Sequence, residues 1–277
     1  MSTSPSPANI PDSLDTPYPI TPEMVEKYQR DGFVILRGVL SPEEIRCWRE
    51  VINACVKKDI GDVRPMDQRD TYGKAFVQIL HLWERFENLR PLSFSKRLGA
   101  IVSALMKCDG VRLMQDQILY KEPGGGCTPW HQDQFYMPFD TDKVCTLWMG
   151  LVDISPEMGV MSWARGGHHD GFLYNGFTSD ASESFFQKTI AEKKWKIVSA
   201  GPMRAGDISV HSGWTPHCAS ANTTDRMREV FNCVYFADGA RIVNRGPWEA
   251  ASSGHLGNRR PGELADADSS PLIFQRG

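Results

Sequence analysis

The first third of the chain places apolar residues at helical spacing, with one strand-like run among them. Thr-Pro-Glu at 21–23 supplies a capping hydroxyl, a proline and an acidic residue, which predicts a helix from residue 22. Ser-Pro-Glu-Glu at 41–44 repeats this signature ahead of a second apolar stripe. The glycine-bounded run 32–38 is typical of a buried strand, and we expect further helices over 76–89 and 93–106.

From about residue 110 the apolar pattern changes to that of strands. Short apolar runs alternate with Gly and Pro, the clearer ones being 111–120, 144–152, 159–163, 207–211 and 228–236. A long insertion at 165–200 contains a stretch, 185–196, that we expect to include a helix. Helices first and strands afterwards predict a mainly β fold with flanking α, an antiparallel barrel or sandwich with the N-terminal helices packed on it.

The two ends of the chain differ in composition from its middle. Residues 1–19 are rich in Ser, Pro and Asp and poor in large apolar side chains, so we interpret them as a disordered or extended tail. We expect residues 20–277 to form a single domain. Within it, 20–110 is mostly helical support, 111–237 is the β core, and 238–277 is a polar, loop-like C-terminal segment.

Composition excludes some function classes. Of the 277 residues, 41% are hydrophobic and 23% are charged, which is typical of a globular protein. A net charge of -3 provides no basic field for nucleic acid or an anionic membrane, and no apolar run has the length of a membrane span. The seven cysteines are scattered without a CxxC pair, so we expect no disulfide framework. We predict a cytoplasmic protein with neither a nucleic-acid nor a membrane partner.

The densest group of metal-capable side chains lies at 129–133, Pro-Trp-His-Gln-Asp. In an extended chain His131 and Asp133 project from the same face and can bind one ion, although such a tripeptide is also typical of a surface pair. His211 and His217, on or after a later strand, are two candidates for a third ligand. Two histidines and one carboxylate leave open positions on an octahedral metal, as in non-haem Fe(II) oxygenases.

An arginine follows the later histidines at a spacing that suits a second strand. Arg228 lies eleven residues after His217 and can offer a planar fork to the carboxylate of a keto acid. Arg226 is the alternative, although a solvated turn residue is the plainer interpretation of it.

Several motifs, taken as an ordered set, resemble one known family. They are the 129–133 segment, Phe-Tyr-Met-Pro-Phe at 135–139, Cys-Thr-Leu-Trp at 145–148, Ile-Ser-Pro-Glu-Met-Gly at 154–159, Gly-Asp at 206–207, and His217 followed by Asn222 and Arg228. Over about residues 20–237 the chain is similar to the phytanoyl-CoA dioxygenase (PhyH) family of Fe(II)/2-oxoglutarate oxygenases. The resemblance implies a double-stranded β-helix, a cupin-like jelly roll with helices on one sheet.

The resemblance also implies roles for individual residues. It places the metal triad on His131, Asp133 and His217, and pairs Arg228 with the distal carboxylate of 2-oxoglutarate. The intact carboxylate of Asp133 favours hydroxylation or a related C–H oxidation, because halogenating relatives replace it. Fe(II), 2-oxoglutarate and O2 are the expected cofactors, with release of succinate and CO2, and ascorbate is an expected stimulant.

Four further positions concern the co-substrate. The resemblance assigns Trp148 and Gln132 to the co-substrate pocket, with core packing as the alternative for both. Some relatives hold 2-oxoglutarate with a serine two residues past the distal histidine, but here that position is Ala219, followed by Ser220. His168 and His169 resemble a structural turn of the family.

For the substrate we expect a small organic molecule, either a secondary metabolite or an amino-acid-like compound. The segments 60–85 and 165–200 and the C-terminal segment are the expected determinants of substrate choice. An acyl-CoA 2-hydroxylase is an alternative, because several lysines of the insertion could attract CoA phosphates. Candidate aromatic residues facing the site are Tyr120, Phe135, Tyr136, Trp163 and Trp214, and the lysines are Lys188, Lys193, Lys194 and Lys196.

Two alternatives belong to other classes. A zinc-dependent hydrolase could use the same ligands but would not need the arginine, and a non-catalytic binding protein would usually have lost a ligand. A homodimer is one oligomeric state that we consider.

Overall fold

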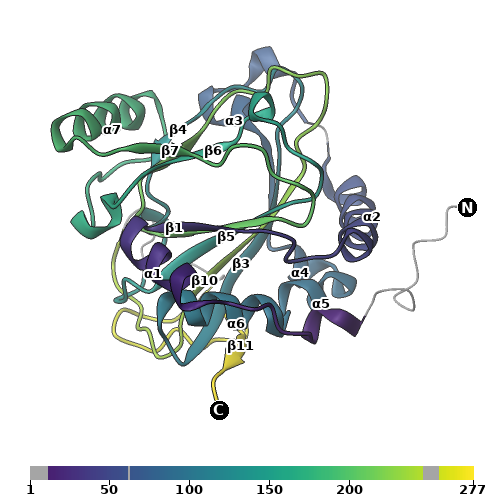
Figure 1. Ribbon diagram of the computed structural model, residues 1–277, viewed down its shortest axis with the longest axis vertical. Coiled ribbons are helices and arrows are strands. Elements are labelled where there is room, and N and C mark those ends of the chain that lie inside the picture. Colours follow the sequence, from purple (N-terminus) through teal and green to yellow (C-terminus); the bar gives the residue numbers. More distant parts are fainter. Residues whose placement is uncertain (1–11, 62, 246–255) are drawn as a thin grey trace, which may run out of the picture.

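The computed structural model describes residues 12–61, 63–245 and 256–277 and is built on antiparallel strands (Figure 1). The strands are β1 (Phe33–Leu36), β2 (Val77–Leu80), β3 (Gly110–Tyr120), β4 (Thr128–His131), β5 (Val144–Gly150), β6 (Met161–Ala164), β7 (Ile197–Ser199), β8 (Ile208–Ser212), β9 (His217–Ala219), β10 (Val230–Ala237) and β11 (Leu272–Gln275). One sheet has the order β1-β8-β5-β10-β3-β11, with β2 also paired to β3, and the other has the order β4-β9-β6-β7. Two antiparallel sheets of this kind form a jelly roll, so the predicted fold class is confirmed.

Helices cover the outer faces of both sheets. They are α1 (Pro22–Asp31), α2 (Pro42–Asp59), α3 (Thr71–Ala75), α4 (Leu82–Arg85), α5 (Arg90–Ser93), α6 (Lys96–Met106) and α7 (Asp180–Lys193). Helices α1, α4 and α6 lie along the larger sheet, whereas α7 and the short helix α3 lie beside β4 of the smaller one (Figure 1). The predicted caps are confirmed: Thr21 accepts a hydrogen bond from the amide of Met24, and Ser41 and Glu44 form a capping box.

The larger sheet separates the hydrophobic core from the functional cavity. Leu147, Val210 and Cys233 are register neighbours on β5, β8 and β10, and all three are fully buried against the helices. Because successive residues of a strand project to opposite faces, the residues beside them face the space between the sheets. Those inward-facing residues include Thr146, Trp148, His211 and Asn232.

The predicted helix over 76–89 is wrong. Its first part is strand β2, which pairs with β3, and only the short helix α4 and a 3-10 turn follow. The spacing of Phe76, Ile79 and Trp83 is that of a helix, but Ile79 also fits the alternation of a strand. Pairing with β3 favours the strand over the helix. His81, which has a φ of 55°, then ends strand β2, and helix α4 begins at the next residue.

Both ends of the chain contribute more structure than their composition predicts. Residues 12–15 form a 3-10 turn that buries Leu14, and the hydroxyl of Ser95 donates to the Leu14 carbonyl. The rest of the predicted tail, residues 1–11, lies outside the described residues. Near the C-terminus, β11 adds to the edge of the larger sheet beside β3, where we had expected only a loop.

Candidate metal centre and co-substrate pocket

A cavity of about 510 Å³ lies between the two sheets and contains most of the predicted site residues. His131, Asp133, His217, Trp148 and Arg228 all line it. A volume in this range suits a single small-molecule site.

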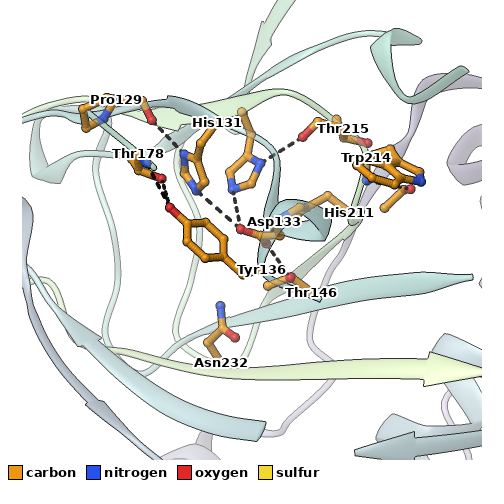
Figure 2. Close-up of polar contacts among 12 residues, drawn as sticks. Pro129, His131, Asp133, Tyr136, Thr146, Thr178, His211, Trp214, Thr215 and Asn232 are labelled. Carbon is orange, nitrogen blue, oxygen red and sulfur yellow. Dashed lines mark hydrogen bonds and ion pairs between the residues drawn. The ribbon is translucent and has the colours of Figure 1, made fainter. Parts of the chain in front are cut away.

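The two histidines and the aspartate converge from separate elements. His131 ends β4, and His217 begins β9 directly opposite it in the strand register. Asp133 begins a 3-10 turn after β4, and its Oδ1 lies 3.4 Å from Nε2 of His131 and 3.6 Å from Nε2 of His217 (Figure 2). One ligand atom from each residue lies within 4.8 Å of the others, which is a spacing suited to one metal ion.

Hydrogen bonds fix the orientation of both imidazoles. Nδ1 of His131 lies 2.7 Å from the Pro129 carbonyl, and Nδ1 of His217 lies 3.0 Å from the Thr215 carbonyl. Each Nδ1 therefore donates a proton, and each Nε2 keeps its lone pair. Burial and the neighbouring His131 and His211 rings hold the pKa of His217 well below its ordinary value, so its ring is neutral. Three electron-pair donors thus converge on one point, and this donor set fits a divalent metal.

The second oxygen of the Asp133 carboxylate is occupied. Oγ1 of Thr146 donates to Oδ2 at 2.6 Å, and Nε2 of His211 donates to the same oxygen at 3.1 Å. His211, the alternative third ligand, therefore lies behind the carboxylate and directs Oδ1 toward the other two histidines (Figure 2). Sequence reasoning missed Thr146, whose role depends on its pairing with His211 across β5 and β8.

Arg228 is buried in the same cavity, with 2% of its surface exposed. Its Nη1 donates to the Gly159 carbonyl, while its Nε is buried without a hydrogen-bond partner among the described residues. The guanidinium lies 5.3 Å from the centre of the Trp148 ring, and burial lowers its pKa to about 9, so it stays charged near neutral pH. An unpartnered buried guanidinium nitrogen fits a ligand carboxylate. Arg226, in contrast, is exposed and lines a different groove.

Gln132 does not line the cavity. Its Nε2 donates to the carbonyls of Gly171 and Trp214, both at 2.7 Å, and its Oε1 accepts from the amide of Leu173. The Gln132 side chain thus points away from the face that carries His131 and Asp133. Its hydrogen bonds connect the 165–200 insertion to the turn after β8. The structure therefore does not bring Gln132 together with the other predicted co-substrate residues.

A threonine hydroxyl lies beside Ala219 on the cavity wall. Ala219 lines the cavity, whereas Ser220 is exposed. Thr128 pairs with Ala219 across β4 and β9, is 6% exposed and also lines the cavity. Asn222 acts in the fold, because its amide closes the turn onto backbone carbonyls, including that of Lys121.

Two of the segments predicted to determine substrate choice contribute residues to the cavity wall. Tyr72 and Gln78 come from 60–85, and Phe177 comes from the insertion. Of the aromatic candidates, Tyr136 lines the cavity, and its hydroxyl accepts from the amide of Thr178 at 2.9 Å. The other four are buried but are not among the lining residues: Tyr120, Phe135, Trp163 and Trp214.

Comparison with known proteins decides the family. The family model described as phytanoyl-CoA dioxygenase (PhyH) matches residues 28–230. The chain belongs to the PhyH family. Its relatives include the 2-aminoethylphosphonate dioxygenase of the uncultured bacterium HF130_AEPn_1, 22% identical over 78% of this chain and 81% of the relative. The phytanoyl-CoA dioxygenase of Arabidopsis thaliana is 23% identical over 80% of this chain and 91% of the relative.

Solved structures agree with the family. The non-haem α-ketoglutarate-dependent carbocyclase SnoK from nogalamycin biosynthesis superposes with a TM-score of 0.76 at 25% identity, over 92% of this chain and 97% of SnoK. EctD from S. alaskensis, at 18% identity and a TM-score of 0.69 over 96% of this chain and 93% of EctD, supports the fold.

This PhyH protein is a non-haem iron and 2-oxoglutarate-dependent dioxygenase, with iron, 2-oxoglutarate and O2 as its cofactors and a small molecule as its substrate. The hydrolase and binding-protein alternatives are therefore excluded. In the part of the chain that the structure describes, none of the helices combines the length and apolarity needed to cross a bilayer.

Proposed function

We propose that this PhyH protein oxidises a C–H bond of a small organic molecule, of the secondary-metabolite kind, while 2-oxoglutarate is converted to succinate and CO2. One observation carries the proposal. The His131, Asp133 and His217 donor set and the guanidinium of Arg228, whose buried Nε has no hydrogen-bond partner among the described residues, open onto the same cavity. A metal site and a carboxylate site so placed suit a keto acid that bridges them.

His131, Asp133 and His217 would hold the iron. Iron with bound 2-oxoglutarate supplies the activation of O2 that C–H oxidation requires. The chain's own task is to fix the ligands: the backbone carbonyls of Pro129 and Thr215 orient the imidazoles, as described above.

The co-substrate would lie between the metal ligands and Arg228. The guanidinium would bind its distal carboxylate, with the Trp148 ring against which the arginine packs as one wall of the pocket. We infer that the hydroxyl of Thr128 replaces the serine hydroxyl that Ala219 lacks, because the two residues are cross-strand neighbours on the cavity wall.

The charges of the cavity favour a free small molecule over an acyl-CoA or a phosphonate. Arg228 is the sole lysine or arginine among the described lining residues, and the co-substrate would occupy it. The lysines of the insertion do not line the cavity: Lys193 pairs with Asp170 at 2.7 Å and Lys188 with Glu192 at 3.8 Å. A phosphate group would therefore lose its hydration without gaining a lysine or arginine partner. The structural similarity to SnoK, a carbocyclase of nogalamycin biosynthesis, supports the secondary-metabolite class.

Succinate release by the iron-loaded enzyme tests the proposal. We would screen polyketide and terpenoid intermediates, amino acids, acyl-CoAs and phosphonates, and follow succinate with and without each compound. His131→Ala and Asp133→Ala should abolish substrate-dependent release and the binding of Co(II), a spectroscopic substitute for iron. Retention of both properties in either variant would remove the metal assignment.

Arg228 and Arg226 form a matched pair for the co-substrate assignment. Replacing Arg228 by Met should raise the KM for 2-oxoglutarate by about 10- to 100-fold, because a charged hydrogen bond contributes about 1.5–3 kcal/mol. Replacing the exposed Arg226 by Met should leave that KM within about twofold of the wild-type value, as expected for most surface changes. The opposite ranking would place the co-substrate elsewhere.

A further inference from the structure

A row of polar side chains crosses the inner wall of the larger sheet. Gln78 on β2, Gln117 on β3 and Asn232 on β10 come from three neighbouring strands, and Tyr72 on α3 lies at the outer end. All four line the cavity. We call these four residues the amide row.

Hydrogen bonds run through the amide row in a single direction. The Tyr72 hydroxyl donates to Oε1 of Gln78 at 3.3 Å, and Nε2 of Gln78 donates to Oε1 of Gln117 at 2.6 Å. Nε2 of Gln117 then donates to Oδ1 of Asn232 at 3.2 Å. Each amide oxygen therefore accepts a hydrogen bond from within the row. Each amide nitrogen has two N–H groups, so the capacity left for a ligand lies mainly in donors.

The inner end of the amide row lies beside the proposed reaction site. Asn232 pairs in register with Gln117 on one side and with Trp148 on the other. Figure 2 shows its amide nitrogen directed toward the side of the cavity that holds Asp133 and Tyr136. The side chains of Gln117 and Asn232 are well shielded, at 7% and 3% exposure. Hydrogen bonds in series polarise one another, so the remaining N–H groups of the row favour a ligand with acceptor atoms.

The surroundings of the amide row define the rest of the ligand. Apolar side chains line the same cavity, among them Phe76, Leu80, Leu119, Met137 and Phe177. The donors of the row are uncharged, and the described lining provides no cation besides Arg228. Uncharged donors suit carbonyl and hydroxyl oxygens better than a dianion, whose desolvation they cannot offset.

We propose that the amide row binds the carbonyl or hydroxyl oxygens of an uncharged, carbon-rich substrate and directs its skeleton toward the metal centre. This inference rests on the proposed function and names the substrate class of the same cavity. A site built to donate to an oxygen rejects the analogue that lacks it, because the buried donors are left unpaired.

The first experiment uses matched pairs of compounds. Hydroxyanthraquinones and steroid ketones would be compared with their deoxy analogues, alongside methylphosphonate and palmitoyl-CoA, by substrate-dependent succinate release. We expect the best turnover from an uncharged oxygenated compound, with its deoxy analogue reduced at least about 100-fold in kcat/KM. Best turnover of a phosphonate or acyl-CoA, or none with any uncharged oxygenated compound while 2-oxoglutarate still binds, would overturn the inference.

The second experiment pairs the protein change with the substrate change. Asn232→Leu and Gln117→Leu should lower kcat/KM for the oxygenated compound about 10- to 100-fold, with little further effect on the deoxy analogue, because both changes remove the same hydrogen bonds. The KM for 2-oxoglutarate and the Co(II) affinity should stay within about twofold of wild type. Equal losses for both compounds would show that the row is merely structural and overturn the inference. Absence of both 2-oxoglutarate binding and iron-dependent 2-oxoglutarate turnover by the wild-type enzyme, whatever the compound, would instead refute the proposed function.

Discussion

Lys121 provides a stringent test of the electrostatics behind the co-substrate pocket. It is fully buried and forms reciprocal backbone hydrogen bonds with Arg228, which lies two residues before β10. Residues paired in this way project to the same face, so two cationic side chains are neighbours away from water. Its ammonium donates to the Gly126 carbonyl, and no ion pair identified within the described residues includes it. Burial, with a further effect of Arg228, lowers its pKa from 10.5 to about 7.

The effect of Lys121 on the free energy of unfolding follows from this pKa. The decrease from 10.5 to about 7 corresponds to a cost of about 5 kcal/mol in the free energy of unfolding, at about 1.4 kcal/mol per pKa unit. This cost is complete below pH 7, where lysine is protonated in both the folded and unfolded chains. It falls as the pH rises from 7 to 10.5, because only the unfolded chain then retains the proton, and about 2 kcal/mol remains at pH 9.

Lys121→Met should therefore stabilise the protein. Allowing about 1 kcal/mol for the lost hydrogen bond to Gly126, we expect a gain of about 4 kcal/mol at pH 7 that falls by more than half at pH 9. Urea unfolding at both pH values measures the gain, and Lys188→Met, on the exposed face of α7, is the matched control that should change stability little. A Lys121→Met protein less stable than wild type at pH 7, or a gain independent of pH, would refute the reasoning.

Three further changes test other parts of the structure. Thr128→Val removes the hydroxyl proposed to contact 2-oxoglutarate and should raise the Kd for 2-oxoglutarate about 3- to 10-fold, measured by calorimetry. An unchanged Kd would show that Thr128 does not make this contact. Thr146→Val leaves His211 as the one hydrogen-bond donor to Oδ2 of Asp133 among those described above, and should weaken Co(II) binding about 10- to 100-fold in an absorbance titration. Unaltered Co(II) affinity would contradict this expectation. Gly206 has a φ of 86° and its added Cβ would meet the Leu40 carbonyl, so Gly206→Ala should lower stability by more than about 1 kcal/mol in thermal unfolding, and an equal Tm would disprove the close contact.

Much of the fold was predictable because its signals are local. The caps at Thr21 and Ser41 and the apolar runs of the main strands each lie within a few consecutive residues. Residues 76–89 were predicted wrongly because their apolar spacing fits both periods, and only the edge of β3, about forty residues later, decides for a strand. In the same way, pairing with β3 gives the C-terminal segment its strand β11.

In the candidate site, too, some features follow from local sequence and others from long-range pairing. The sequence by itself predicted the donor types, the His131 and Asp133 pair and the arginine at 228, since these predictions rest on residue identity and short spacing. Tertiary structure decided that His217 converges with that pair while His211 holds the far carboxylate oxygen, and that Gln132 points away. It also assembled the amide row across three strands. The physical reason is strand register, because a shift of one residue moves a side chain to the opposite face of the sheet and only long-range pairing sets that register.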